Sequence, residues 1–154
     1  RPAGHGGHRP LRRHPHRVLV AGGSVGAFGR HSGRSLLELA EEVIVGAVAT
    51  ARVSRSDLAA AFVGNAFGGA ITGQESILAQ TLLSPAGIEG IPMRTVKNAC
   101  SSGADAVHLG WSAVAFGQYD CVLVLGAEKL THEDRSRAFQ ALASATDHAP
   151  ASEG

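Results

Sequence analysis

One cysteine in the chain lies where a short β-like run meets the start of a helix. The run 94–99 ends directly before Cys100, and the small residues Ser101, Ser102 and Gly103 then open a strongly apolar helix. Unpaired backbone N–H groups and the positive end of the helix dipole favour an anion at such a helix start. A cysteine there tends to have a lowered pKa, and the thiolate is its nucleophilic form. The pattern makes Cys100 a candidate nucleophile, and the alternative is a buried free cysteine, which is common in proteins.

The other titratable side chains fit structural roles better than chemical ones. Cys121 falls inside the apolar run 119–125, which is typical of a buried strand. His108 follows Cys100 by two helical turns, or about 12 Å at 1.5 Å per residue, so we expect a packed core histidine rather than a general base. Packing or loop roles are also expected for Trp111, His31, His132 and Glu128.

The composition is that of one small folded domain. The chain has 154 residues, of which 44% are hydrophobic, 18% charged and 5% aromatic. Its formal charge of +1 hides an asymmetry, because residues 1–17 contain five arginines and no acid. The remainder carries nine basic and thirteen acidic side chains, a formal charge of −4. A nucleic-acid-binding surface is therefore not expected for the folded part, and no apolar run is long enough to span a membrane.

The two ends of the chain differ from its centre. Residues 1–17 have no hydrophobic periodicity, and their histidines lack a regular metal-binding pattern, so we expect a disordered or artefactual basic tail and no metal site. The domain itself is expected over 18–146, and 147–154 as a polar tail at a truncation point. Two cysteines do not suggest a disulfide scaffold, which favours a reducing, cytoplasmic location.

Strand and helix patterns alternate along the domain. The glycine-rich turn 22–29 lacks the spacing of a dinucleotide-binding loop, and a capping box at Ser35 and Glu38 opens the clearest helix. This alternation predicts an α/β fold with a mainly parallel sheet. Strands are expected at 18–21, 60–65, 91–99 and 119–126, a glycine-rich loop at 67–73, and further helices at 75–83 and after Cys100.

The helix after Cys100 is apolar on nearly every side, so it is expected to be buried on all sides. One four-stranded layer covers only one of its faces. The sequence therefore predicts that the chain lacks part of the covering of its own central helix.

Five short motifs follow one another along the chain: Phe-Gly-Arg-His at 28–31, 63–69, Thr-Gly-Gln-Glu-Ser at 72–76, Asn-Ala-Cys-Ser-Ser-Gly at 98–103, and 126–132. This ordered set resembles the N-terminal half of the thiolase superfamily, nearest the sterol-carrier-protein-x-like, lipid-transfer-associated thiolases. The resemblance covers residues 18–146. It implies the N-terminal half of a thiolase-like layered α/β/α fold, with a mainly parallel sheet and a buried helix that bears the nucleophile.

The resemblance also implies a chemistry. Cys100 would accept an acyl group from a coenzyme A thioester, either in thiolytic cleavage or in Claisen condensation, with no permanently bound cofactor. Backbone N–H groups at the helix start would stabilise the oxyanion. Asn98, Ser101, Ser102 and Gly103 would support the nucleophile through turn geometry, capping and close approach of the substrate. Acyl-CoA is the implied partner, and the complete protein is expected to be a homodimer.

The chain also departs from the family pattern. Gly26 stands where the family usually has threonine or serine, and no Gly-His-Pro motif occurs in the 154 residues. Thiolases carry an activating histidine and a second cysteine in a C-terminal half, so we expect this chain alone to be inactive and to need that half or a partner subunit. Two alternatives remain: a non-catalytic thiolase-fold partner, and a ketoacyl-synthase-type condensing enzyme, which the stretches 63–69 and 73–76 disfavour.

Overall fold

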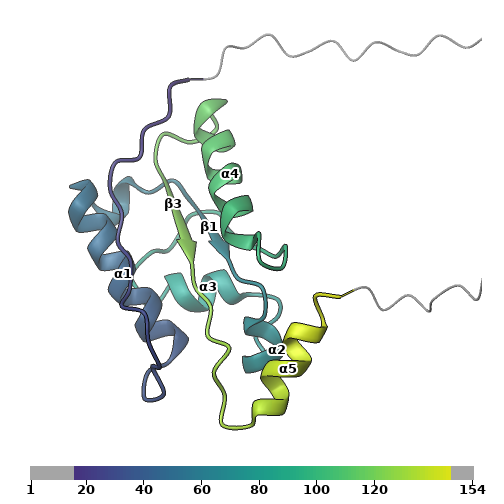
Figure 1. Ribbon diagram of the computed structural model, residues 1–154. Coiled ribbons are helices and arrows are strands. Elements are labelled where there is room, and N and C mark those ends of the chain that lie inside the picture. Colours follow the sequence, from purple (N-terminus) through teal and green to yellow (C-terminus); the bar gives the residue numbers. More distant parts are fainter. Residues whose placement is uncertain (1–15, 147–154) are drawn as a thin grey trace, which may run out of the picture.

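Three parallel strands form the centre of the fold in the computed structural model, which describes residues 16–146 (Figure 1). They are β1 (Ala60–Gly64), β2 (Met93–Val96) and β3 (Val122–Gly126), in the order β2-β1-β3. The middle strand β1 is buried at every position because it pairs on both edges and is covered on both faces.

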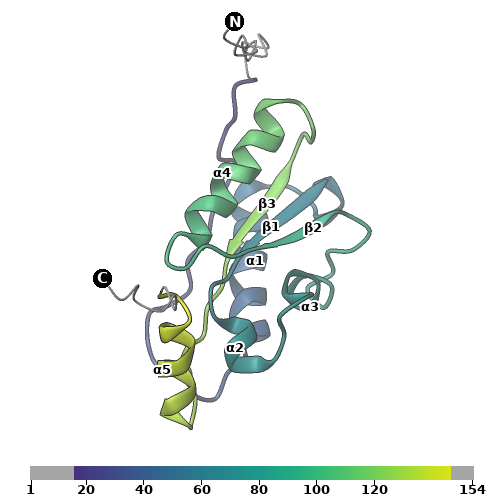
Figure 2. The same ribbon diagram turned by 90° about the vertical axis from the view of Figure 1, so that its right-hand side faces the viewer.

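Helices cover both faces of this sheet. On one face lie α1 (Leu36–Ala51) and α3 (Leu78–Leu83), whose apolar side chains pack with Ala61 and Val63 of β1. On the other face lies α4 (Ser102–Ala115), which packs on Ala60 and Phe62. Alternate residues of β1 thus serve opposite layers, as the two-residue period of a strand requires. Figures 1 and 2 show the layers from two sides. The α/β class with a parallel sheet is confirmed.

The expected capping box starts α1. Ser35 Oγ accepts a hydrogen bond from Glu38 N at 3.2 Å, and the Glu38 carboxylate accepts one from Ser35 N at 2.6 Å. These bonds favour the charged carboxylate, so the pKa of Glu38 lies below its ordinary value of 4.5. The helix ends at Ala51, and the following residue, Arg52, caps it in left-handed geometry with φ of 56°.

The expectation of a strand at 18–21 is wrong. This segment is irregular and runs beside α1, where Gly23 N donates to Thr50 Oγ1 at 3.1 Å. A side chain at Gly22 would collide with the backbone of Ala51, so the segment approaches α1 closely there. Leu19 and Val20 point to solvent. Apolar residues alone do not make a strand, since among residues 16–146 no neighbouring strand pairs with this segment.

Several boundaries also differ from those expected. The glycine-rich stretch 67–73 contains a short helix, α2 (Gly68–Thr72), and the helix expected from residue 75 begins only at Leu78. The sequence patterns missed α5 (Arg135–Ala143), which packs on α2. Of the basic tail, residues 1–15 lie outside the described residues, as does the polar tail 147–154. His16 is described, and its backbone N–H donates to Ala115 O at 2.6 Å.

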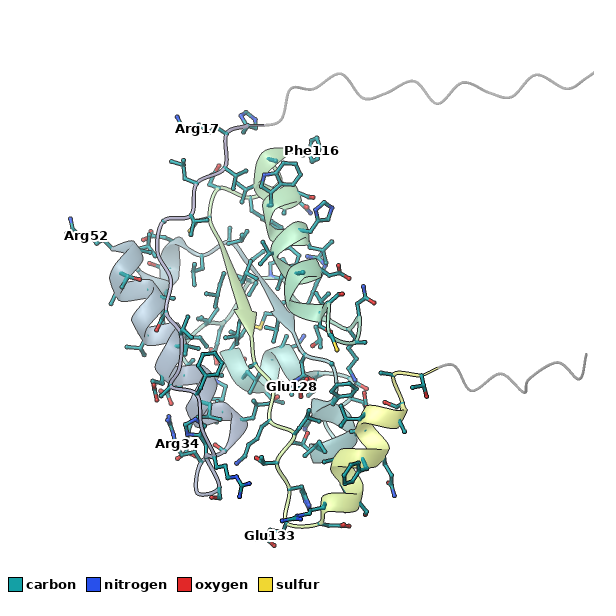
Figure 3. All side chains as sticks on the ribbon, in the orientation of Figure 1. Arg17, Arg34, Arg52, Phe116, Glu128 and Glu133 are labelled. Atoms are coloured by element: carbon teal, nitrogen blue, oxygen red, sulfur yellow. The ribbon has the colours of Figure 1, made fainter. Side chains whose placement is uncertain are left out.

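The helix α4 is buried on one face only. Its sheet-facing side is formed by small residues, and a side chain at Gly110 would come within 2.7 Å of Val124. The core roles expected for His108 and Trp111 are wrong, because both are exposed and stack on each other with ring centroids 5.9 Å apart. Among residues 16–146 nothing covers this outer side, in line with the missing cover that the sequence indicated. Phe116, at the far end of α4 in Figure 3, contacts Trp111 edge-on. The exposed large hydrophobic residues of this outer face are Val107, Leu109, Trp111 and Phe116.

Candidate active site

Cys100 lies in a tight turn between β2 and α4, at the edge where the parallel strands end. Ser101 N donates to Asn98 O at 2.8 Å, and Ser102 N donates to Ala99 O at 3.2 Å. Ala99 has φ of 43°, in the left-handed region that is unfavourable for a residue with a Cβ. Cys100 itself is exposed. The turn therefore presents the thiol to solvent directly before the amino end of α4.

The hydroxyl of Ser102 holds this turn from inside. Ser102 is 4% exposed, and its Oγ donates to Ala99 O at 2.7 Å and accepts from Asn98 N at 2.8 Å. Asn98 also uses its side chain, whose Nδ2 donates to the Asp105 carboxylate at 2.6 Å. The structure thus brings Asn98, Ser101 and Ser102 together around Cys100. Ser101 precedes α4 as its N-cap residue but makes no side-chain capping bond.

Gly103 has a different place in the turn. A Cβ added at Gly103 would meet no atom, but one added at Gly64 would lie 2.7 Å from Ser102 O and 2.8 Å from Gly103 Cα. The start of α4 therefore rests directly on the end of β1, backbone against backbone. It is Gly64, rather than Gly103, that allows this approach, and its place at the end of an apolar strand was the available sequence signal.

The electrostatic setting separates the two cysteines. Cys100 is exposed and lies directly before the start of α4, at the end of the sheet where the strands end. Cys121 is half-buried against the core just before β3, and burial, with a smaller contribution from the Asp57 charge, raises the pKa of its thiol. Both cysteines are free, and Cys121 lies at the end of the sheet where the strands begin.

A cavity of about 570 Å³ opens beside the Cys100 turn. Ala99 and Lys97 form part of its wall, and Lys97 makes an ion pair with Glu75, which also lines the cavity. Phe67 contributes an apolar side, and the remaining lining comes from neighbouring residues of 66–70 and from 144–146. Such a mixed cavity next to an exposed thiol is suited to a ligand with a polar and an apolar part.

The backbone around Ala66 and Phe67, two residues of this cavity wall, is fixed by two side chains. Glu128 accepts hydrogen bonds from the backbone N–H groups of Ala66 at 2.7 Å and Phe67 at 3.0 Å. Asn65, 1% exposed, donates to Ala127 O at 2.6 Å and accepts from Gly68 N at 2.7 Å. Glu128, labelled below the end of β3 in Figure 3, is thus the loop anchor that the sequence suggested.

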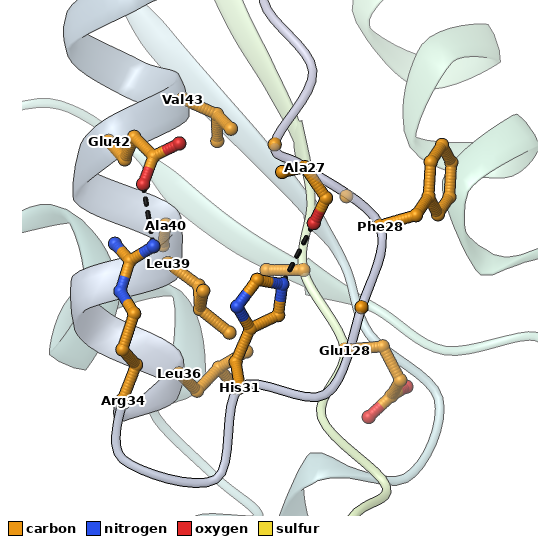
Figure 4. Close-up of a pocket in the computed structure, with 14 residues that line it drawn as sticks. Ala27, Phe28, His31, Arg34, Leu36, Leu39, Ala40, Glu42, Val43 and Glu128 are labelled. Atoms are coloured by element: carbon orange, nitrogen blue, oxygen red, sulfur yellow. Dashed lines mark hydrogen bonds and ion pairs between the residues drawn. The ribbon is translucent and has the colours of Figure 1, made fainter.

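A second cavity, of about 300 Å³, lies between the segment 26–31 and α1 (Figure 4). Arg34 and Glu42 form an ion pair at 2.7 Å on its rim, and the His31 ring nitrogen contacts Ala27 O at 2.8 Å. Lys129 Nζ donates to the backbone carbonyls of His31 and Arg34. His31 thus holds a loop, as expected, and no residue of the Cys100 turn lines this cavity.

The His132 ring also makes a loop contact, accepting from Asp134 N at 3.0 Å. Within residues 16–146, no group of His, Cys, Asp and Glu side chains has a metal-binding arrangement. Over the same residues, no helix has the length and hydropathy needed to cross a membrane.

Comparison with known proteins identifies the family to which this fold and turn belong. Residues 18–152 match the N-terminal domain of thiolases, and the chain is a member of the thiolase family. The acetyl-CoA acetyltransferase of Methanothermobacter thermautotrophicus is 38% identical over 114 residues, which are 74% of this chain and 30% of that protein. Human sterol carrier protein 2 is 34% identical over 118 residues, covering 75% of this chain and 21% of that protein. The chain therefore spans less than a third of the length of these relatives.

Solved structures share the fold. A 3-oxoacyl-[acyl-carrier-protein] synthase III from Aquifex aeolicus superposes with a TM-score of 0.57 at 23% identity, over 72% of this chain and 36% of that one. The Acat5 thiolase from Ascaris suum, solved in complex with coenzyme A, superposes with a TM-score of 0.53 at 20% identity, over 61% of this chain and 24% of that one. At these identities the two structures show a common fold and no more.

Proposed function

We propose that this chain is the N-terminal part of a thiolase-like acyltransferase in which Cys100 carries the acyl group. The observation that supports this most strongly is the exposed Cys100 in a strained turn at the start of α4, within a chain of the thiolase family. The relative named acetyl-CoA acetyltransferase suggests acyl-CoA as the substrate. Coenzyme A is then a substrate and product rather than a resident cofactor.

The first step is transfer of the acyl group to the cysteine. The Cys100 thiolate attacks the thioester carbonyl carbon, and the carbonyl oxygen becomes an oxyanion that N–H groups at the start of α4 stabilise. The carbon–sulfur bond to coenzyme A then breaks, and the coenzyme A thiolate leaves and takes up a proton. Cys100 is left as a thioester, and in condensation the carbanion of a second acyl-CoA attacks it and the Cys100 thiolate leaves. In thiolytic cleavage the same acyl-cysteine forms by attack on the 3-keto carbonyl carbon of a 3-ketoacyl-CoA: the carbon–carbon bond breaks, the departing acetyl-CoA carbanion takes up a proton, and a coenzyme A thiol then takes the acyl group from Cys100.

The residues around Cys100 fix the geometry of the turn that holds it. Asn98 and Ser102 hold the turn by the hydrogen bonds described above, Ser101 closes it through its backbone N–H, and Gly103 supplies the backbone that rests on Gly64. We assign these residues to support of the nucleophile. The cavity beside Ala99 would receive the substrate.

The activating histidine and second cysteine of this chemistry are proposed to come from a C-terminal half or a partner subunit. The exposed outer face of α4 supports this, because large apolar side chains there have no cover within residues 16–146. The same observation favours the second candidate function, a non-catalytic subunit that retains the fold for assembly. The complete protein is proposed to be a homodimer, and its cytoplasmic location stays a prediction.

Acylation distinguishes these functions. The chain is supplied with the C-terminal part of a thiolase relative and incubated with acetyl-CoA, and the modified peptide is located by mass spectrometry. We expect the acyl group on Cys100, its loss in Cys100→Ser and its retention in the matched control Cys121→Ser. A label found only on Cys121, or none in any sample, would contradict the acyltransferase function. Unchanged activity of the mixture with Cys100→Ala would favour the non-catalytic subunit.

A further inference from the structure

The Cys100 turn is closed by a side-chain link between Asn98, the first residue of the motif at 98–103, and Asp105, which lies beyond that motif. Asn98 Nδ2 donates to Asp105 Oδ2 at 2.6 Å, which joins the residue before the turn to the first turn of α4. Cys100 lies on the segment between the two linked residues. Because the acceptor is a carboxylate, this bond is stronger than one between neutral groups.

This turn requires restraint from its surroundings. Ala99 adopts φ of 43°, a conformation that glycine tolerates and alanine does not favour. Such a conformation persists only where neighbouring contacts over-determine it. Two of these contacts use the backbone, since Asp105 N donates to Ser101 O at 2.9 Å and Ser101 N donates to Asn98 O at 2.8 Å. The Asn98–Asp105 bond adds a side-chain restraint at the position directly before Ala99.

Asp105 also brings a charge to the first turn of α4. Lys97, one residue before Asn98, and its ion-pair partner Glu75 are also charged groups close to the turn. Asparagine at 105 would remove the charge and keep an oxygen that accepts from Asn98, whereas alanine would remove both. The two substitutions therefore separate the hydrogen bond from the charge.

We propose that Asp105 is a positioning residue for Cys100, holding the Asn98 side chain and through it the strained turn that presents the thiol. The inference rests on the proposed function of Cys100 as the acyl acceptor. Asp105 acts through Asn98 and touches neither the substrate nor the reacting atoms. Its effect is on how well the thiol and the N–H groups at the helix start are aligned with the thioester.

Amide hydrogen exchange of Ser101 and Ser102 measures the turn without reference to catalysis. With Asp105→Ala we expect exchange to be about two- to fivefold faster, the factor that an exposed charge-assisted bond supplies. Asp105→Asn should stay within about twofold of the unmodified chain. Asp120→Ala is the matched control, because Asp120 is exposed and precedes β3 at the opposite end of the sheet. Unchanged exchange in Asp105→Ala would overturn the proposal.

Acylation by acetyl-CoA then tests the effect on Cys100. The acylation rate is measured as a function of pH with the C-terminal part of a thiolase relative present. The plateau of this rate at high pH reports the geometry of the thiolate, and the midpoint of the pH profile reports the effect of the Asp105 charge. The plateau should fall by the same two- to fivefold in Asp105→Ala and be restored in Asp105→Asn. An Asp105→Asn plateau as low as that of Asp105→Ala would overturn the role of the hydrogen bond. If the unmodified protein is not acylated, the proposed function fails, and amide exchange still decides whether Asp105 holds the turn.

Discussion

Gly64→Ala is expected to displace the start of α4 and to destabilise the chain by about 2–3 kcal/mol, the upper part of the range for an overpacked site. The new Cβ would lie 2.7 Å from Ser102 O, 2.8 Å from Gly103 Cα and 2.9 Å from Gly103 N. All three are backbone atoms, so no side chain can rotate away to relieve the contact. The helix start must move as a unit, and the Cys100 turn must move with it.

The matched control is Gly126→Ala. Gly126 pairs with Gly64 across the sheet, in the last register position of β1 and β3, but a Cβ there would meet no atom. Its substitution should change stability by less than about 0.5 kcal/mol, as at surface sites without special contacts. The two variants thus make the same chemical change at neighbouring positions and differ only in the space available.

Urea unfolding followed by the fluorescence of Trp111, the single tryptophan, measures this difference on the helix that moves. The expected 2–3 kcal/mol lowers the urea midpoint by about 1–2 M at an m-value near 1.5–2 kcal/mol/M. Alkylation of Cys100 in the folded state reports the displaced turn. A Gly64→Ala midpoint equal to that of Gly126→Ala would refute the close contact between β1 and α4.

Three further predictions concern other parts of the molecule. Ser35→Ala should lower stability, because it removes the capping bond to Glu38. Since Ser35 depresses the pKa of Glu38, the stabilisation from this pair is present above pH 4.5 and is lost as pH falls through the folded pKa of Glu38. Thermal unfolding at pH 3 and pH 7 should therefore show a smaller difference in Tm between the variant and the unmodified chain in acid. Iodoacetamide near pH 7 should modify Cys100 faster than Cys121, whose thiol is half-buried with a raised pKa, and peptide mapping showing the reverse order would contradict this. The isolated chain should associate through the outer face of α4, so Val107→Lys should shift sizing profiles toward the monomer, and a sharp, concentration-independent monomer peak for the unmodified chain would count against it.

The elements that the sequence predicts correctly are those whose signals are local. The capping box at Ser35 and Glu38 needs only a four-residue segment, and it starts α1 as expected. The apolar runs that became β1 and β3 are short and continuous, as suits strands covered on both faces. Cys100 was placed at a helix start by the same kind of local pattern.

The errors arise where the outcome depends on distant partners. Residues 18–21 have the composition of a strand, but a strand also needs a neighbouring backbone, and residues 16–146 supply none there. The helical phase of His108 and Trp111 shows that they share a face, yet it cannot show whether anything covers that face. The place of Gly64 at the end of an apolar strand was a weak signal, because the contact itself depends on where the start of α4 comes to rest.

Glu128 and Lys129, adjacent in the chain just after β3, tie down two separate loops. Glu128 binds the N–H groups of Ala66 and Phe67, 61–62 residues earlier, and Lys129 binds the 31–34 turn, 95–98 residues earlier. During synthesis from the N-terminus, neither loop can acquire its anchor until this pair has left the ribosome. Contacts between such distant residues also require long loops to close first. The cavity wall beside the nucleophile is therefore among the last parts of the fold to be fixed, after most of the described chain has been made.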